Sequence, residues 1–198
     1  MAIRIFDIIF SLLLIIVLLP VMFLLLLLCS IFIEFPPIYI SKRIGKGKKA
    51  YTHFKYKSMK SGPELGRVFF EQDRINRFGR FIRKYHLDEL PELFLILIGK
   101  MSFVGPRALP IVLLDGLDYE TRCKVLPGNT CLSQIWLLKK GQLDKHLQIK
   151  LDNLYVNKRS FQYNLKIILT TVKYLFKSKK IDLNPNLNKQ RISFKRVL

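Results

Sequence analysis

An uncharged apolar stretch of 26 residues, 8–33, constrains what this chain can fold into more than any other feature. Only Ser11, Pro20 and Ser30 interrupt its apolar character. As a helix it would extend roughly 39 Å, whereas the hydrocarbon core of a bilayer is roughly 30 Å thick. It is too long for the apolar core of a cleaved signal peptide, and no small-x-small cleavage pattern follows it. The sequence therefore predicts a membrane helix within residues 1–34.

Pro20 lies at the middle of this stretch, where a proline removes one backbone hydrogen bond and kinks a helix. Two arrangements follow from the composition: a kinked spanning helix, and a re-entrant helix that enters and leaves by the same face. Residues 35–63 carry eight Lys or Arg and no acidic residue, which predicts that this side is cytoplasmic. Arg4 favours the same side weakly.

The rest of the chain is strongly basic. Arg4, Asp7 and Glu34 are the charged residues of the first 34, so the remaining 164 hold 33 basic and 12 acidic side chains, a net charge of +21. This charge suits a polyanionic partner, and the apolar stretch argues against a purely soluble protein. The sequence also argues against a multi-span transporter, because it has no second uncharged stretch of comparable length. The three cysteines have no disulfide or metal-ligand spacing, so we expect reduced thiols.

Residues 35–180 are predicted to form an α+β domain that is mainly helical. The stretches 38–44 and 50–57 are rich in β-branched and aromatic residues and are joined by Gly45-Lys46-Gly47-Lys48. In the second stretch every other residue belongs to one set, which would share a face of a strand and comprises Tyr51, His53, Lys55 and Lys57. This pattern is typical of a β-hairpin with one polar, basic face.

Three helices are predicted after the hairpin. The first is basic and lies around 74–84; the second begins near Asp88, which can cap it, and ends at Gly99. In the third, near the C-terminus, an apolar face lies opposite a basic one. The apolar face comprises Leu165, Ile168, Leu169, Val172, Leu175 and Phe176. The opposite face comprises Lys166, Thr170, Lys173 and Lys177. We expect this amphipathic helix to lie on anionic membrane lipids, and residues 181–198 to form a basic tail.

The most informative chemical feature is the adjacent pair Asp88-Glu89, which follows a basic helix and precedes Val104-Gly105-Pro106-Arg107. Carboxylates beside cations suit a phosphate site with a divalent metal, because Mg²⁺ is commonly held by one or two carboxylates and substrate phosphates. Arginine adds bidentate phosphate contacts. Acidic residues in a first helical turn, however, more often serve capping alone.

The order of the motifs resembles that of the monotopic phosphoglycosyl transferases, the bacterial initiating sugar transferases. The matching segments are Arg4–Asp7, Lys42–Gly45, Phe54–Met59, Gly79–Lys84, Asp88–Leu93, Gly99–Arg107, Pro127–Gly128 with Gln134, and Leu151–Asp152 with Tyr155–Val156. The Asp-Glu-Leu-Pro and Met-Ser-x-Val-Gly-Pro-Arg blocks are specific at this separation. Together the segments cover the chain from Arg4 to about Ile181.

The resemblance implies transfer of a phospho-sugar from a UDP-sugar to polyprenyl (undecaprenyl) phosphate, with release of UMP. It implies that Asp88 is the nucleophile, that Glu89 helps to hold Mg²⁺, and that three cations bind the diphosphate. Those cations are Lys55, Arg83 and Arg107. A carboxylate is a reasonable nucleophile once cations neutralise the phosphate oxygens.

Other positions follow from the resemblance alone. It makes Asp152, Gln134 and Pro106 candidate pocket residues, and it favours the re-entrant helix with Pro20 as its break. The domain would then lie on the cytoplasmic face of the bacterial inner membrane. The chain departs from the family pattern at Lys57, Ala108, Cys131 and Leu132-Ser133, around the expected nucleotide and sugar pocket. The sugar is therefore not predicted.

Two alternatives lack catalysis. One is a membrane-anchored basic module that binds acidic lipid or nucleic acid, although no nucleic-acid motif appears and nucleic acid is not an expected partner. The other is a family member that scaffolds other glycan enzymes. The expected partners are a UDP-sugar, polyprenyl phosphate and anionic lipids, and a homodimer is compatible with the sequence.

Overall fold

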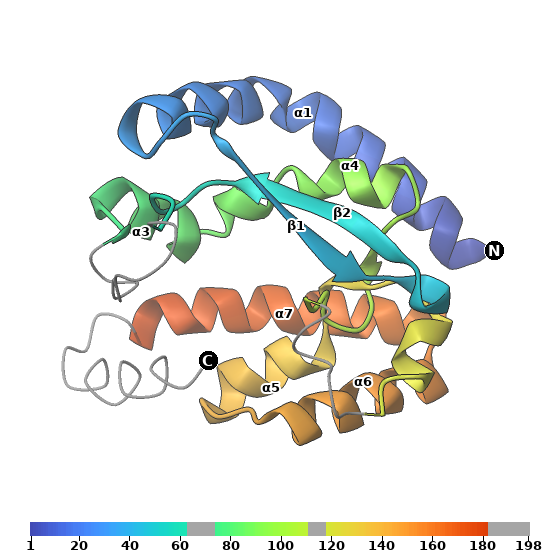
Figure 1. The fold of residues 1–198 in the computed structure, drawn as a ribbon. Helices are drawn as coiled ribbons and strands as arrows, with labels where there is room; N and C mark the ends of the chain where they lie inside the picture. Colours follow the sequence, from blue (N-terminus) through green and yellow to red (C-terminus); the bar gives the residue numbers. More distant parts are fainter. Residues whose placement is uncertain (63–73, 111–117, 182–198) are drawn as a thin grey trace.

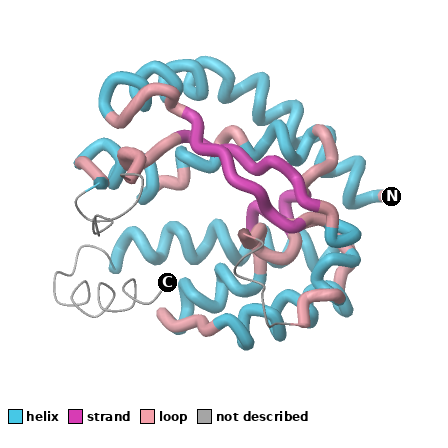
Figure 2. Tube along the Cα trace, viewed as in Figure 1, coloured by secondary structure: helices cyan, strands magenta, loops and turns pink. Residues whose placement is uncertain are grey.

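The computed structural model describes residues 1–62, 74–110 and 118–181. Its elements are α1 (Ala2–Phe32), β1 (Ile38–Ile44), η1 (Lys46–Lys48), β2 (Ala50–Tyr56), α3 (Arg77–Lys84), η2 (Leu87–Glu89), α4 (Glu92–Leu97), β3 (Ser102–Val104), η4 (Thr121–Lys124), β4 (Gly128–Thr130), α5 (Leu132–Lys140), α6 (Lys145–Lys158) and α7 (Phe161–Ile181). The hairpin β1–β2 crosses the middle of the molecule, with α1 and α4 on one side and α5, α6 and α7 on the other (Figure 1). Figure 2 shows how few residues form strands. The predicted mixed architecture is confirmed.

Helix α1 packs against the domain along almost its whole length. Its buried residues lie on one face, at spacings of three, four or seven: Asp7, Ser11, Ile15, Met22, Leu25 and Cys29. The helix is continuous through Pro20 and arches over α4 and the hairpin (Figure 1). Its outward side chains are apolar and exposed. Within the described residues, α1 is the one helix long and apolar enough to cross a membrane.

Polar contacts fix α1 to the domain at two levels. The Arg4 guanidinium donates to the last carbonyls of α4, at 2.5 and 2.6 Å, and the carboxylate of Asp7 accepts the main-chain N–H of Phe103 at 3.1 Å. Near the middle of α1, the Tyr56 hydroxyl donates to the carbonyl of Met22 at 2.8 Å. The helix is therefore held by the same elements that carry the candidate site.

The hairpin forms with the predicted strands. Ile38 pairs with Tyr56 and Ile44 with Ala50 in an antiparallel register. The polar face of β2 turns inward toward α4, so that Tyr51 and His53 are buried while Ala50 is exposed. Charged partners on α4 and η2 make this inward orientation favourable, because a buried charge must be paired.

Two glycines bring the segment after β3 against the segment that leads into β4. A Cβ on Gly105 would lie 2.4 Å from the carbonyl oxygen of Leu126, and one on Gly128 would lie 2.0 Å from the Gly105 nitrogen. The two backbones are also joined by hydrogen bonds, of which the Gly128 N–H to the Pro106 carbonyl measures 2.9 Å. This close approach, which no other residue permits, fixes the position of Pro106-Arg107.

The basic helix α3 begins after Asn76, whose side chain accepts the Gly79 N–H at 2.7 Å. A Cβ on Gly79 would lie 2.0 Å from the carbonyl oxygen of Ser58, so this glycine allows α3 to pack against the segment that follows β2. The predicted helix start at Asp88 is divided into the 3₁₀ turn η2 and the helix α4, and neither has a side-chain cap. Asp88 therefore does not cap the helix. Gly99 ends it as predicted, with φ of +77°.

Helix α7 is amphipathic, as expected. Of its predicted apolar face, Leu165, Leu169 and Val172 are exposed, whereas Ile168 packs against the core. The side chains of Leu175 and Phe176 lie outside the described part of the chain. Further contacts to the domain come from Asn164 and Ile167, which are buried. The basic tail expected over 181–198 lies outside the described residues from position 182 onward.

Candidate active site

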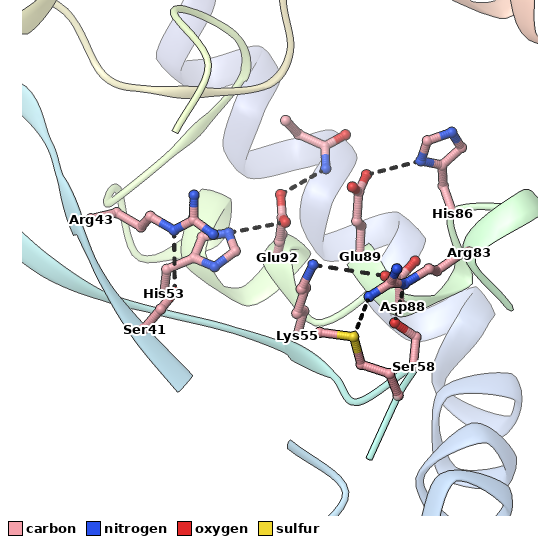
Figure 3. A network of polar contacts seen from close by, with 12 residues as sticks. Ser41, Arg43, His53, Lys55, Ser58, Arg83, His86, Asp88, Glu89 and Glu92 are labelled. Carbon is pink, nitrogen blue, oxygen red and sulfur yellow. Dashed lines mark hydrogen bonds and ion pairs between the residues drawn. The ribbon is translucent and has the colours of Figure 1, made fainter. Parts of the chain in front are cut away.

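Asp88 and Lys55 lie at the centre of the candidate site (Figure 3). Asp88 is buried in η2, and its Oδ2 lies 3.9 Å from Lys55 Nζ on β2. This distance is longer than a charge-assisted hydrogen bond, so the Lys55 ammonium keeps the capacity to donate to a phosphate oxygen, and the Asp88 carboxylate keeps the capacity to approach a phosphorus atom. Burial raises the pKa of Asp88, the Glu89 carboxylate adds to the rise, and Lys55, Arg83 and His86 oppose it.

Arg83 enters the same site from the last turn of α3. Its Nε donates to Ser58 Oγ at 2.6 Å, and its Nη2 lies 3.1 Å from Met59 Sδ. These contacts to the segment after β2 direct the guanidinium toward Asp88 (Figure 3). The basic helix thus contributes a cation that a diphosphate could use.

Glu89 is held by His86, which the sequence analysis did not select as a functional residue. His86 Nδ1 donates to Glu89 Oε2 at 3.3 Å, and this contact raises the pKa of His86. Burial would raise the pKa of Glu89, but His86 and the cations Lys55 and Arg107 hold it below its ordinary value. His86 adopts a left-handed conformation with φ of +55°, which turns the chain from α3 into η2. No local sequence signal marks that turn, because most non-glycine residues avoid positive φ.

Arg107 is exposed and close enough to Glu89 to lower the pKa of that carboxyl. The adjacent Pro106 is buried, and its carbonyl accepts the N–H of Gly128. Pro106 therefore has a structural contact of its own, whereas the side chain of Arg107 is left at the surface beside the carboxylate pair. Arg83, Arg107 and Lys55 reach the site from three separate elements.

The remaining two predicted pocket residues are held by other neighbours. Gln134 lies in the first turn of α5 and is contacted by the thiol of Cys131. Asp152 on α6 is 1% exposed, and its Oδ2 lies 3.0 Å from Nε of the equally buried Arg122. Burial raises the pKa of Asp152 to about 6, even though Arg122 lowers it. Arg122 also donates to the carbonyl of Arg107, so this ion pair supports the loop that carries Arg107.

A second polar cluster, which the sequence analysis also missed, adjoins the carboxylate pair. Glu92 on α4 accepts hydrogen bonds from His53 Nε2 at 3.0 Å and from Asn129 Nδ2 at 2.9 Å. Figure 3 shows His53 and Glu92 next to Lys55 and Glu89. Two spacings in the sequence could have indicated this cluster. His53 and Lys55 are two residues apart and so lie on one face of a strand, and Glu89 and Glu92 are three apart and so lie on one face of a helix.

The donor set bears on whether this site fits Mg²⁺. In the described ranges, no group of three His, Cys, Asp or Glu side chains forms a metal cluster. Within the candidate site, the adjacent carboxylates of Asp88 and Glu89 are the groups placed to contact a metal. Because Mg²⁺ usually combines one or two carboxylates with substrate phosphates and water, these residues fit an ion that binds together with a diphosphate.

Carboxylates facing cations suit the binding and transfer of phosphate groups, and an apolar helix packed along the same domain suits membrane association. These features are typical of membrane-associated proteins that handle phosphate esters. Comparison with known families narrows this class, because the model of the bacterial sugar transferase family matches residues 1–178. The chain belongs to that family.

Curated relatives agree with this assignment. The chain is 33% identical over 182 residues to UDP-glucose:undecaprenyl-phosphate glucose-1-phosphate transferase of Klebsiella pneumoniae, covering 85% of this chain and 39% of the relative. It is 31% identical over 147 residues to UDP-N-acetylgalactosamine-undecaprenyl-phosphate N-acetylgalactosaminephosphotransferase of Aeromonas hydrophila, covering 70% and 35%. It is also 32% identical over 185 residues to the exopolysaccharide production protein PSS of Rhizobium leguminosarum bv. phaseoli, covering 85% and 92%. The chain thus spans little more than a third of the first two relatives.

Proposed function

We propose that this chain transfers a phospho-sugar from a UDP-sugar to polyprenyl (undecaprenyl) phosphate and releases UMP, as an initiating step of bacterial surface glycan synthesis. The observation that carries this proposal is the buried Asp88 carboxylate, 3.9 Å from Lys55 and adjacent to Glu89, in a member of the bacterial sugar transferase family. The names of the Klebsiella and Aeromonas relatives support the same acceptor for them.

The reaction proceeds in two displacements at phosphorus. In the first, a carboxylate oxygen of Asp88 attacks the β-phosphorus of the UDP-sugar, the bond to the bridging oxygen breaks, and UMP leaves. In the second, a phosphate oxygen of the acceptor attacks the phosphorus of the aspartyl phospho-sugar, and the Asp88 carboxylate is released. The product is a polyprenyl diphosphate sugar, and the enzyme returns to its starting state.

Each neighbouring residue has a role that its position supports. Lys55, Arg83 and Arg107 bind the diphosphate oxygens and balance their charge. Glu89 would hold Mg²⁺ together with substrate phosphates, and the ion would neutralise charge on the leaving phosphate. Burial of Asp88 keeps water away from the carboxylate, which strengthens these electrostatic contacts and protects the acyl phosphate from hydrolysis.

The direct test measures nucleotide release from a panel of UDP-sugars with the full chain in detergent, Mg²⁺ and polyprenyl phosphate. We expect UMP from one or a few of the sugars, and the product would identify the donor. Release of UDP would indicate ordinary glycosyl transfer and contradict the mechanism. A folded protein that releases no nucleotide from any donor would favour a non-catalytic scaffold.

The same proposal includes the placement of the protein on the cytoplasmic face of the inner membrane, with α1 re-entrant. The support is the burial of α1 from Asp7 to Cys29 against the domain. A helix that crossed the bilayer away from the domain would leave most of that face in lipid. Exposed apolar residues on α1 and α7 then contact the membrane, and Lys166 and Lys173 contact anionic head groups.

Cysteine labelling distinguishes the two topologies. The three natural cysteines are buried, so Ala2→Cys and Lys60→Cys, at exposed positions, provide reporters at the start of α1 and beyond its end. With a membrane-impermeant maleimide on intact spheroplasts, we expect neither reporter to react, and both to react after permeabilisation. Labelling of Ala2→Cys alone in intact spheroplasts would show that α1 spans the membrane.

A further inference from the structure

We propose that Glu92 is a positioning residue, which sets the register between strand β2 and the turn that carries Asp88 and Glu89. The inference deepens the proposed transfer and rests on it for its kinetic consequences. Glu92 and His53 are 6% and 4% exposed, and their side chains meet at 3.0 Å. Neither residue has a role in the transfer described above.

Two contacts join β2 to the segment η2–α4, in opposite chain order. The first contact is between His53 and Glu92. The second is between Lys55, which lies two residues after His53, and Asp88, which lies four residues before Glu92. Two residues of a strand rise about 6.6 to 6.8 Å. The four residues from Asp88 to Glu92 run from the 3₁₀ turn η2 into α4 and rise about 6 to 8 Å, so both contacts form together in one register. The buried contact is the shorter of the two, at 3.0 Å against 3.9 Å, and it therefore fixes the spacing of the site contact.

The second oxygen of Glu92 extends the same control to a third segment. It accepts from Asn129 at 2.9 Å, and Asn129 follows Gly128, which is hydrogen-bonded to Pro106. Pro106 precedes Arg107. One carboxylate thus connects the three segments that supply Lys55, the carboxylate pair and Arg107.

The burial of Glu92 makes this arrangement rigid. A carboxylate in an apolar interior is costly unless both oxygens are hydrogen-bonded, and here each has a partner. If the hydrogen bonds were lost, the segments would separate or shift to hydrate the charge. Misplacement of a reacting group by about 1 Å can lower a rate about 10²-fold, so register at this point matters for Asp88.

The test compares Glu92→Gln with Glu92→Leu, which keeps no hydrogen-bonding atom. The Gln oxygen can accept from Asn129, and the Gln NH₂ can donate to His53 Nε2 once His53 adopts its other tautomer. We expect Glu92→Leu to lower kcat by about tenfold or more while the KM for the UDP-sugar changes less than about threefold, and Glu92→Gln to restore most of kcat. Asn164→Leu is the matched control, because Asn164 is buried and accepts the Tyr155 hydroxyl at 2.9 Å outside the site. It should lower thermal stability without the selective loss of kcat.

A second readout does not depend on activity. Limited acetylation with acetic anhydride, followed by mass spectrometry, compares Lys55 with the exposed Lys42, which donates to Thr52 on the same hairpin. We expect the Lys55-to-Lys42 labelling ratio to rise at least about threefold in Glu92→Leu and to stay near wild type in Glu92→Gln and Asn164→Leu. If Glu92→Leu does not fold, His53→Leu and Asn129→Leu each remove one contact and serve in its place.

The outcomes separate this inference from the proposed function. Wild-type kcat and wild-type Lys55 labelling in Glu92→Leu would overturn it, and so would equal losses in the Gln and Leu variants. A wild-type protein that releases no nucleotide would contradict the proposed function instead, and the labelling ratio alone would then decide the positioning role.

Discussion

Asp88→Asn is expected to abolish phospho-sugar transfer, with UMP release falling by at least about 10³-fold. The amide has nearly the shape of the carboxylate, so the fold and the contacts of Arg83 and Glu89 should persist. It cannot, however, form the aspartyl phospho-sugar. Incubation of wild type with the UDP-sugar, without acceptor, should therefore add the mass of one phospho-sugar to the intact protein, and the variant should add none.

The matched control is Asp144→Asn, which makes the same chemical change away from the site. Asp144 caps α6 by accepting the Leu147 N–H at 2.7 Å, and asparagine caps a helix about as well as aspartate. This variant should keep both activity and the covalent adduct. Undiminished transfer by Asp88→Asn would remove Asp88 from the role of nucleophile, whatever the control shows.

The hairpin could be predicted from the sequence because the pattern that indicates it lies within the hairpin itself. Alternating residues in 50–57 and the Gly-Lys-Gly-Lys turn need no distant partner to be interpreted. The same alternation showed that Tyr51, His53 and Lys55 share a face, but not that this face is buried. That outcome depends on Asp88 and the segment after it, which lie more than thirty residues away in the chain. Periodicity carries no information about such pairs.

The candidate site was predictable in part for a similar reason. Asp88 and Glu89 are adjacent in sequence, so their proximity needed no structure, whereas their approach to Lys55 and Arg107 was implied only by family resemblance. The parallel pair β3–β4 has three residues in each strand, too few for a periodic pattern. It forms because Gly105 and Gly128 allow two backbones to touch.

The largest expected stability effect is at Asp152, which the sequence analysis placed in the pocket and the structure pairs with Arg122. Asp152→Asn leaves the Arg122 guanidinium buried without a counter-charge. Removal of one partner from a buried ion pair costs about 3–5 kcal/mol. For a chain of this size each kcal/mol lowers Tm by about 2–4 °C, so a fall of about 6–20 °C is expected. Thermal unfolding in detergent at pH 8, where Asp152 is ionised, measures it.

The double variant Asp152→Leu with Arg122→Leu distinguishes a structural role from a pocket role. The raised pKa of Asp152 indicates that Arg122 does not fully offset the cost of burying the carboxylate. Replacement of such a pair by apolar residues is often neutral or stabilising, so the double variant should recover most of the lost Tm. A double variant as stable as wild type that no longer binds the UDP-sugar would instead give the pair a role in substrate binding, by direct contact or through the loop that carries Arg107. Failure to recover stability would show that the pair contributes net free energy that apolar packing cannot replace.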